Sequence, residues 1–319
     1  MTARSTASSA TADAFDPLEL GAASDTPPPA PAPDTAARLR WPRLRTTEWV
    51  GVGILAVVAA TILIVPLLPG SDPYAQNLSA SFIPPFTDAA HLLGTDMLGR
   101  DLASRVAVGG QVSLGIVLFV VAINAFVGMV TGMIAGYAGG RLDNLLMGWA
   151  DVQLAMPIIL VLIALSAALG PNVWLMILTL AATYWVGYAR VARSAAMSLK
   201  GRDFVIAPRI QGASPQWIVS THIAPHVGVQ VLILASADIG GVLLLTSSFD
   251  YLGLGVQAPT PSWGLLISEG QKYVREAPYL ALIPGIAIFL VVIGTNLLSQ
   301  RFTAERELSA LRRRKKVRA

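Results

Sequence analysis

An acidic residue inside a long apolar stretch is the position in this chain that most clearly invites chemistry. Asp238 lies near the middle of the stretch 227–247, beside Gly240 and Gly241. A carboxylate at membrane depth is costly unless it faces a water-filled cavity or a polar partner. Asp238 could therefore meet a cationic group, such as the ammonium end of a solute, or it could bond to a neighbouring helix. Its position favours neither role.

A second polar residue, Asn124, lies in the apolar stretch 112–135. An amide there could line a path for a solute, but a hydrogen bond between helices is the commoner use of such a side chain. Three glycines in the same region recur every four residues, at Gly128, Gly132 and Gly136. They predict a smooth helix face that another helix backbone can approach closely.

Four charged residues of alternating sign lie in the segment 69–111. They are Asp96, Arg100, Asp101 and Arg105. They could contact another protein, or they could pair with one another and fold the segment, and we favour internal pairing.

A tryptophan, Trp263, follows Pro259, Pro261 and Ser262 in the segment 248–278. Tryptophan is enriched where a membrane meets water. We therefore expect Trp263 to anchor a rigid loop at that interface, which is a positioning role and not a ligand-binding one.

The segment 194–226 carries signals for two short helices. Ser214 suits the N-cap of the second, and Pro215 suits its first helical position, because proline has no N–H to leave unpaired there. We expect this helix to end near Ile223. Its apolar edge would comprise Trp217 and Ile218, continued by Thr221 and His222. That edge could enter a groove on a soluble partner or lie at the lipid interface, and the spacing alone does not separate the two.

The elements that must position these residues are membrane helices. The chain has 319 residues, of which 54% are hydrophobic and 13% charged, and its mean hydropathy is +0.61. A helix needs roughly 20 apolar residues to cross about 30 Å of hydrocarbon. The stretches that meet this requirement are about 49–68, 112–135, 152–169, 173–193, 227–247 and 279–299. The predicted fold is thus an all-α integral membrane protein with six transmembrane helices.

The distribution of Lys and Arg predicts the orientation. With six spans, 19 of the 23 Lys and Arg residues share the side on which both chain ends lie. The other four are Arg100, Arg105, Lys272 and Arg275. Loops rich in Lys and Arg stay in the cytoplasm. Both termini are therefore expected to be cytoplasmic, with 69–111 and 248–278 as outer loops and 194–226 as the inward loop.

The ends of the chain differ in composition from the middle. Residues 1–37 are rich in Ala, Ser, Thr and Pro and predict a disordered cytoplasmic tail. Residues 38–302 would form the membrane domain, and 303–319 a basic cytoplasmic tail. Membrane topology explains that basic run better than nucleic-acid binding does. The chain has no cysteine and three histidines, so disulfides and thiolate metal sites are excluded and we expect no metal site.

Three motifs resemble those of ABC importer permeases. Residues 91–115, HLLGTDMLGRDLASRVAVGGQVSLG, and 251–270, YLGLGVQAPTPSWGLLISEG, are similar to outer-loop motifs of the dipeptide, oligopeptide and nickel permease family. Both are typical of its C-type subunit. A third motif resembles the family's cytoplasmic coupling signature, with Ala207, Gly212, Ala213, Ser214, His222, Ile223 and Pro225 matching. Together with the helix layout, the resemblance covers residues 41–302.

This resemblance implies the type I importer permease fold and a bacterial cytoplasmic-membrane complex. Its other members would be a second homologous permease, two ATPase subunits and an external solute-binding protein. The coupling loop would seat on the ATPase through Phe204, Val205, Ala207, Arg209, Gly212, Ala213, Ser214, Trp217, His222 and Pro225. No phosphate-loop motif is present in the chain, so ATP and magnesium are expected on the partners and this chain is not expected to be an enzyme or to hold a cofactor.

The function implied is uptake of small peptides by alternating access, with Asp238 and Asn124 as candidate path residues. Nickel or another small solute is the alternative within the family. An ion-coupled secondary transporter is a more distant one, since it would predict an internal repeat and paired membrane acids. We find no repeat and essentially one deep acid.

Two residues depart from the coupling signature. Ile206 stands in place of an acidic residue and Pro208 in place of an alanine. The first change removes a polar contact to the ATPase. The second removes a backbone donor, so the first coupling helix is expected to start late or to be kinked. Docking would then rest on shape and on apolar residues, namely Phe204, Val205 and Ile210.

Overall fold

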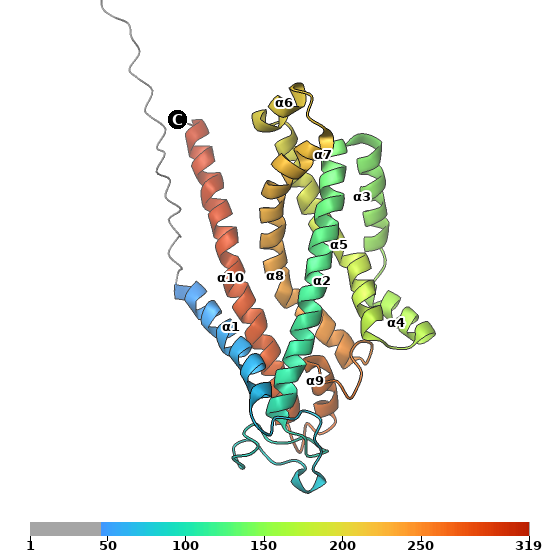
Figure 1. Cartoon of the computed structure of the whole chain (residues 1–319), viewed down its shortest axis with the longest axis vertical. Coiled ribbons are helices and arrows are strands. Elements are labelled where there is room, and N and C mark those ends of the chain that lie inside the picture. The colour runs from blue at the N-terminus through green and yellow to red at the C-terminus, as the bar shows by residue number, and fades with distance from the viewer. Residues whose placement is uncertain (1–45, 319) are drawn as a thin grey trace, which may run out of the picture. The chain divides into compact units, whose positions relative to one another are not determined.

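The computed structural model describes residues 46–318, and the chain there is almost entirely helical (Figure 1). The longer helices are α1 (Thr46–Ile64), α2 (Leu102–Ala138), α3 (Gly140–Leu154), α4 (Ile158–Leu169), α5 (Val173–Lys200), α8 (Ala224–Tyr251) and α10 (Tyr279–Arg318). The shorter ones are α6 (Asp203–Ile210), α7 (Pro215–Ile218) and α9 (Trp263–Gln271). One isolated bridge, between Thr95 and Asp101, is the only β pairing among these residues.

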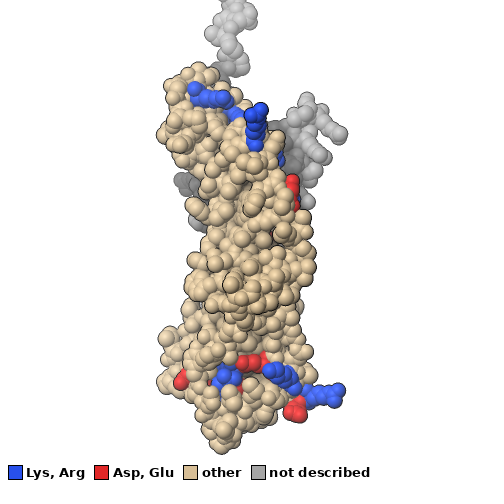
Figure 2. Space-filling view, turned by 90° about the vertical axis from the view of Figure 1, so that its right-hand side faces the viewer, with Lys and Arg blue, Asp and Glu red and all other residues tan. Residues whose placement is uncertain are grey.

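The helices agree with the prediction of an all-α membrane protein. Five are long and apolar enough to cross a membrane, and the number becomes six if the bent pair α3–α4 forms one span. On the face shown in Figure 2, the Lys, Arg, Asp and Glu side chains gather toward the two ends, and the middle has none. That arrangement suits a hydrocarbon layer around the middle of the helices.

The prediction of one continuous helix over 152–169 is wrong. The structure has α3 up to Leu154 and then α4 from Ile158, and the two are bent by 74° at the break. Pro157 causes this, because a proline disfavours helical backbone in the residue before it and offers no N–H of its own. It serves as the N-cap of α4, with φ −63° and ψ 114°.

The glycine face of α2 packs against α5, as the sequence predicts. A Cβ on Gly128 would lie 2.4 Å from the Cβ of Tyr188, and a Cβ on Gly132 would lie 2.2 Å from the carbonyl oxygen of Ala189. Such distances leave no room for a side chain. Helices α2, α5 and α8 each contact the other two, while α10 packs on α1, α8 and α9.

Several predicted loop boundaries differ from those in the structure, because the helices extend further than hydropathy indicates. Helix α2 already begins at Leu102, within the predicted outer loop 69–111. Helix α5 continues to Lys200, so the connection between α5 and α8 comprises residues 201–223, and we call it the α5–α8 connection. The predicted tail 1–37 lies outside the described residues, and from residue 303 to Arg318 the chain continues α10.

Candidate functional sites at the two ends of the bundle

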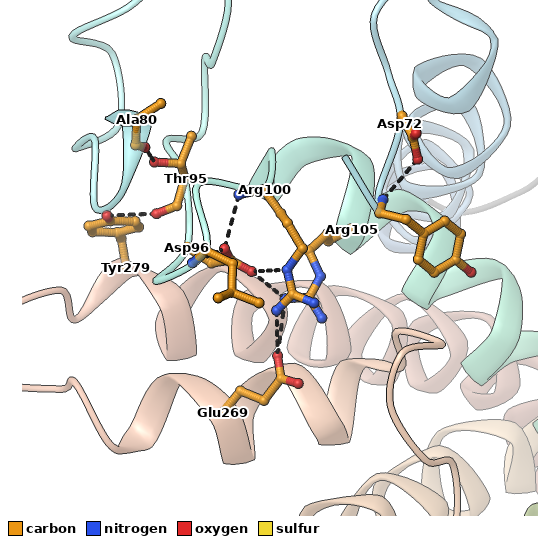
Figure 3. Close-up of polar contacts among 10 residues, drawn as sticks. Asp72, Ala80, Thr95, Asp96, Arg100, Arg105, Glu269 and Tyr279 are labelled. Atoms are coloured by element: carbon orange, nitrogen blue, oxygen red, sulfur yellow. Dashed lines mark hydrogen bonds and ion pairs between the residues drawn. The ribbon is translucent and has the colours of Figure 1, made fainter. Parts of the chain in front are cut away.

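Four charged residues form a buried cluster at the start of α2, which we call the Asp96 cluster (Figure 3). Asp96 Oδ2 lies 2.7 Å from Arg100 Nε and 2.5 Å from Arg105 Nη1. Glu269 of α9 completes the cluster, with its Oε2 3.0 Å from Arg105 Nη1 and 3.6 Å from Arg100 Nη2. The Arg105 side chain is 2% exposed. Two cations thus meet two anions, which is what makes burial of these charges tolerable.

Asp96 also holds the turn before α2. Its Oδ1 accepts hydrogen bonds from the backbone N–H groups of Leu98, at 2.8 Å, and Arg100, at 3.0 Å. Burial by itself would raise the pKa of Asp96. The two backbone N–H groups and the charges of Arg100 and Arg105 outweigh burial, so the pKa of Asp96 lies below its usual value.

Asp101 has a different role from Asp96. Its Oδ2 caps α2 by accepting from the backbone N–H of Ser104 at 2.8 Å and from its hydroxyl at 2.6 Å. Its Oδ1 lies 3.1 Å from His91 Nδ1. The four outer charges are thus all used within the chain, as the internal-pairing interpretation expects.

The sequence did not identify three partners of this region, namely His91, Glu269 and Tyr279. The Tyr279 hydroxyl donates to the carbonyl oxygen of Thr95 at 3.0 Å. Glu269 and Tyr279 lie more than 160 residues from the groups they bind, so no local pattern points to them. The only signal for Glu269 is charge balance. Buried arginines need acidic partners, and the predicted outer loop 248–278 carries Glu269.

The predicted interfacial position of Trp263 is wrong. Its side chain is fully buried, and its Nε1 donates to the carbonyl oxygen of Val106 at 2.8 Å. Its backbone N–H donates to Ser113 Oγ at 3.0 Å. Gly110 leaves room for the ring, since a Cβ there would lie 2.8 Å from it. Trp263 therefore fastens the start of α9 to α2 and does not anchor a loop in lipid.

At the opposite end, the α5–α8 connection has the predicted helix signals. Ser214 Oγ accepts from the backbone N–H of Trp217 at 3.3 Å, and Pro215 is the first residue of α7. Gly212 has φ +84°, a value that favours glycine. Pro208 lies inside α6, which nevertheless begins at Asp203.

The second predicted helix is not a separate element. Helix α7 passes into a π-helical turn, Val219–Ile223, and then directly into α8. Its predicted apolar edge is also divided, because Ile218 is fully buried and Trp217 is 48% exposed. Ring contacts tie α6 to this turn and to the start of α8, because the ring centroid of Phe204 lies 6.4 Å from that of His222 and 5.5 Å from that of His226.

The residues predicted to dock on a partner fall into three groups. The exposed ones are Phe204, Ala207, Arg209, Gly212, Ser214, Trp217 and Pro225. Ala213 and His222 are half-buried, and Val205 is buried. Ile206 and Ile210 add exposed apolar surface, and Ile210 is 82% exposed. The connection thus presents an apolar surface at the end of the bundle.

The two candidate path residues differ in their surroundings. Asp238 is half-buried and interacts electrostatically with the hydroxyl groups of Tyr184 and Tyr188 on α5. Asn124 is 1% exposed, and its Nδ2 donates to the carbonyl oxygen of Val120 at 2.8 Å, one turn back in α2. In this structure Asn124 reaches neither a surface nor a partner helix through that bond.

Comparison with known proteins places this architecture in a family. Residues 128–305 match the family described as binding-protein-dependent transport system inner membrane component. A probable D,D-dipeptide transport permease, DdpC, of Escherichia coli (strain K12) is 36% identical over 76% of this chain and 81% of its own length. The nickel transport permease NikC of the same organism is 38% identical over 71% and 81%.

A third relative is the oligopeptide transport permease OppC of Haemophilus influenzae, which is 32% identical over 77% of this chain and 80% of its own length. The chain therefore belongs to the family of inner-membrane components of binding-protein-dependent transport systems. The predicted resemblance to ABC permeases of the dipeptide, oligopeptide and nickel group is confirmed. Proteins of this family are multi-pass inner-membrane permease subunits and are not themselves ATPases.

Proposed function

We propose that this chain is the permease subunit of an ATP-driven importer and that it translocates small peptides by alternating access. Relatives named for D,D-dipeptide, dipeptide and oligopeptide transport support the peptide assignment. We propose a complex with a second homologous permease, two ATPase subunits that hold ATP and magnesium, and an external solute-binding protein, all in the bacterial cytoplasmic membrane.

The observation that carries this proposal is the apolar surface of the α5–α8 connection. Phe204 and Ile210 are exposed on α6, which lies outside the long apolar spans at one end of the bundle (Figure 1), and Trp217 is exposed near the first residue of the span Pro215–Tyr251. Exposed apolar side chains on a short helix suit a hydrophobic groove on a partner protein. We propose that the ATPase supplies this groove, which makes this end of the bundle cytoplasmic together with both termini.

The two departures from the coupling signature fit an apolar form of docking. Ile206 is exposed where the signature has an acid, so its side chain can add apolar contact in place of a polar one. Pro208 leaves α6 formed from Asp203 to Ile210. We propose that α6 seats as a preformed unit.

Asp238 is the residue that we propose for the path through the membrane. It is half-buried on α8 and could receive the ammonium group of a peptide. We expect an Asp238→Asn substitution to lower peptide uptake at normal levels of assembled complex, because the amide cannot supply the negative charge. Unchanged uptake would remove Asp238 from the path.

The test is purification of the tagged chain with its accompanying subunits, followed by reconstitution into liposomes. We expect ATPase subunits to copurify and labelled di- to pentapeptides to accumulate only with ATP and the binding protein present. The control is the same preparation with a non-hydrolysable ATP analogue. Failure of any ATPase to copurify would contradict the proposal.

Nickel is the second candidate solute, because NikC is 38% identical to this chain. The same liposomes, given radioactive nickel in place of peptide, separate the two. Uptake of nickel and not of peptides would replace the substrate and leave the permease assignment intact.

A further inference from the structure

A cavity of about 670 Å³ lies between α2, the start of α5 with the turn before it, and the connection from α8 to α9. Its lining comes from three segments far apart in sequence, namely 111–119, 171–177 and 256–260. These segments lie toward the end of the bundle that is opposite α6 (Figure 1). The volume is typical of pockets that hold a small molecule. We call this space the α2–α5 cavity.

Most of the lining of the α2–α5 cavity is apolar or aromatic. Ile116, Val173 and Ile177 line it together with Phe119 and Trp174, whose ring centroids lie 6.5 Å apart in an edge-to-face arrangement. None of the described residues that line it is charged, and none is a histidine. A nickel ion, for which imidazole is a suitable ligand, finds no such group here. The two rings instead suit contact with an apolar side chain.

Three amide side chains line the same cavity and leave hydrogen-bonding groups free. Gln111 Nε2 donates to the carbonyl oxygen of Ile62 at 3.0 Å, and Gln257 Nε2 donates to two carbonyl oxygens of its own loop at 3.0 and 3.1 Å. Asn172 Oδ1 accepts from a backbone N–H of α5 at 2.8 Å. Among the described residues, no hydrogen bond reaches the Oε1 atoms of the two glutamines or Nδ2 of the asparagine. The lining therefore offers two free acceptors and one free donor.

This set of groups matches a peptide better than a lipid. Each peptide unit carries one N–H donor and one C=O acceptor, so it can use a free acceptor and the free donor of the lining at once. A lipid tail offers no hydrogen bond to a polar group. The uncharged lining also favours the apolar part of a solute over its charged ends.

The wall formed by 256–260 is held in place from inside the fold. Asp250, which is 2% exposed, accepts a hydrogen bond through Oδ1 from the backbone N–H of Val256 at 2.8 Å. Gly255 makes this contact possible, because a Cβ there would lie 2.1 Å from the same oxygen. A wall fixed in this way need not be ordered when a ligand arrives, which reduces the free-energy cost of binding.

A second cavity, of about 380 Å³ between α3, α4 and α5, shows a different chemistry. Its Gln153 is bonded at both ends of the amide, because Nε2 donates to the carbonyl oxygen of Ala182 and Oε1 accepts from Trp185 Nε1 at 3.0 Å. The hydroxyl groups of Thr179 and Thr183 donate to carbonyl oxygens one turn earlier in α5, each at 2.7 Å. Because these polar groups are used within the chain, this cavity suits lipid tails. The α2–α5 cavity differs from it in the three free amide groups.

We propose that the α2–α5 cavity binds a short peptide during transport, with a large apolar side chain against the two rings and a peptide group at the three amides. The preferred solutes are thus peptides that carry phenylalanine, leucine or a residue of similar size and polarity. The inference rests on the proposed function as a peptide permease, and it adds a binding site and a class of side chain to that function.

Gly115 allows the cavity to be filled by one substitution. It lines the cavity on α2, it is exposed, and a Cβ there would meet no atom within 4 Å. Gly115→Trp therefore places a large ring in the space without a clash at its Cβ. The matched control is Gly53→Trp on α1, which is also exposed and free of neighbours but lines neither cavity. Both variants are purified with their subunits and reconstituted with the binding protein.

ATP-driven uptake is compared for two labelled tripeptides, triglycine and its analogue with a central phenylalanine. We expect Gly115→Trp to lower uptake of the phenylalanine peptide at least about tenfold and that of triglycine less than about twofold, because burial of the phenylalanine side chain is worth the larger factor. Gly53→Trp should leave both unchanged. The same binding protein serves every variant, so its own selectivity cancels from the comparison.

A photoreactive tripeptide with a central benzoylphenylalanine tests the site without a substitution. Irradiated with the native complex, it should become attached to the segments 111–119, 171–177 or 256–260, as identified by mass. Excess phenylalanine tripeptide should suppress this product. The measurement needs no uptake, so it decides the matter even if Gly115→Trp fails to fold.

Four results would overturn the inference. Unchanged uptake of both peptides by Gly115→Trp would mean that the solute does not enter the cavity. Equal loss of both would mean a general block and no side-chain site. Loss of the second permease from the purified Gly115→Trp complex would place the cavity in a subunit interface. Attachment of the photoreactive peptide only outside the three segments would place its site elsewhere. Absence of uptake by the native complex, with attachment still confined to these segments, would count against the proposed function alone.

Discussion

Charged side chains near the start of α2 are buried and paired inside the chain, whereas the α5–α8 connection leaves apolar and aromatic side chains exposed. At the first end, Arg100 and Arg105 neutralise Asp96 and Glu269. At the second, Ile210 and Trp217 project outward. A buried charge needs an oppositely charged partner within the fold, whereas an exposed apolar surface can be covered by another protein. The charged residues of the Asp96 cluster find their partners within this chain, whereas the exposed apolar surface of the α5–α8 connection is suited to contact with another subunit.

Removing a cation from the Asp96 cluster should have the largest effect on stability. In Arg105→Leu, the Asp96 and Glu269 carboxylates keep Arg100 but lose the more deeply buried of their two shared cations, and removing one partner of a buried ion pair typically costs about 3–5 kcal/mol. We expect a clearly lower thermal unfolding temperature in detergent. The control is Arg275→Leu in the exposed turn after α9, which should change stability by less than about 0.5 kcal/mol. Equal effects of the two changes would show that the cluster is not the stabilising feature.

The Trp263 hydrogen bond should have an intermediate effect. Trp263→Phe keeps most of the ring and removes the Nε1–H that binds the Val106 carbonyl oxygen. The carbonyl lies inside α2 and keeps its place in the helix ladder, so the loss is that of one hydrogen bond, about 0.5–1.5 kcal/mol. Trp149→Phe on α3, where the ring is exposed, is the control and should be nearly neutral. Stability unchanged in Trp263→Phe would contradict the fastening role of Trp263.

Acid should weaken the same end of the bundle. The pKa of Asp96 is lowered in the folded chain, so its contribution is fully present above the unfolded value of about 3.9 and is lost as pH falls through the lower folded value. Unfolding temperatures measured from pH 6 to pH 3 should therefore decline below about pH 4 in the native chain. Asp96→Asn should lack this part of the decline, and an identical profile for both would refute it.

Substitution on the α5–α8 connection should have the smallest effect on stability. Ile210 is 82% exposed, so Ile210→Asp is expected to change the free energy of unfolding by less than about 0.5 kcal/mol. Because the new charge cannot enter an apolar groove, recovery of the ATPase with the tagged chain should nevertheless fall. Full recovery of the ATPase would show that Ile210 is not part of the docking surface.

The sequence predicts the membrane helices well because apolar length alone is required to cross a bilayer. Hydropathy does not show the bend at Pro157, because it stays high through 152–169, whereas the proline itself is a signal for a helix break. Trp263 shows a second limit, because tryptophan suits both an interface and a buried site with a hydrogen-bond acceptor. Glu269 shows a third, since its partners lie across the fold. The N-cap at Ser214 is predicted correctly, because a cap and its helix are adjacent in sequence.

Cross-linking from two equally exposed positions tests the difference between the ends most directly. Ile210 and Phe86 are both 82% exposed, one on α6 and the other in the segment before α2, and the chain has no cysteine of its own. Each is replaced by cysteine and carries a photoactivated cross-linker in the purified complex. We predict that Ile210→Cys joins this chain to an ATPase subunit and that Phe86→Cys does not. Cross-links to the ATPase from Phe86→Cys, or none from Ile210→Cys in a complex that contains ATPase, would contradict the assignment of the α5–α8 connection as the docking end.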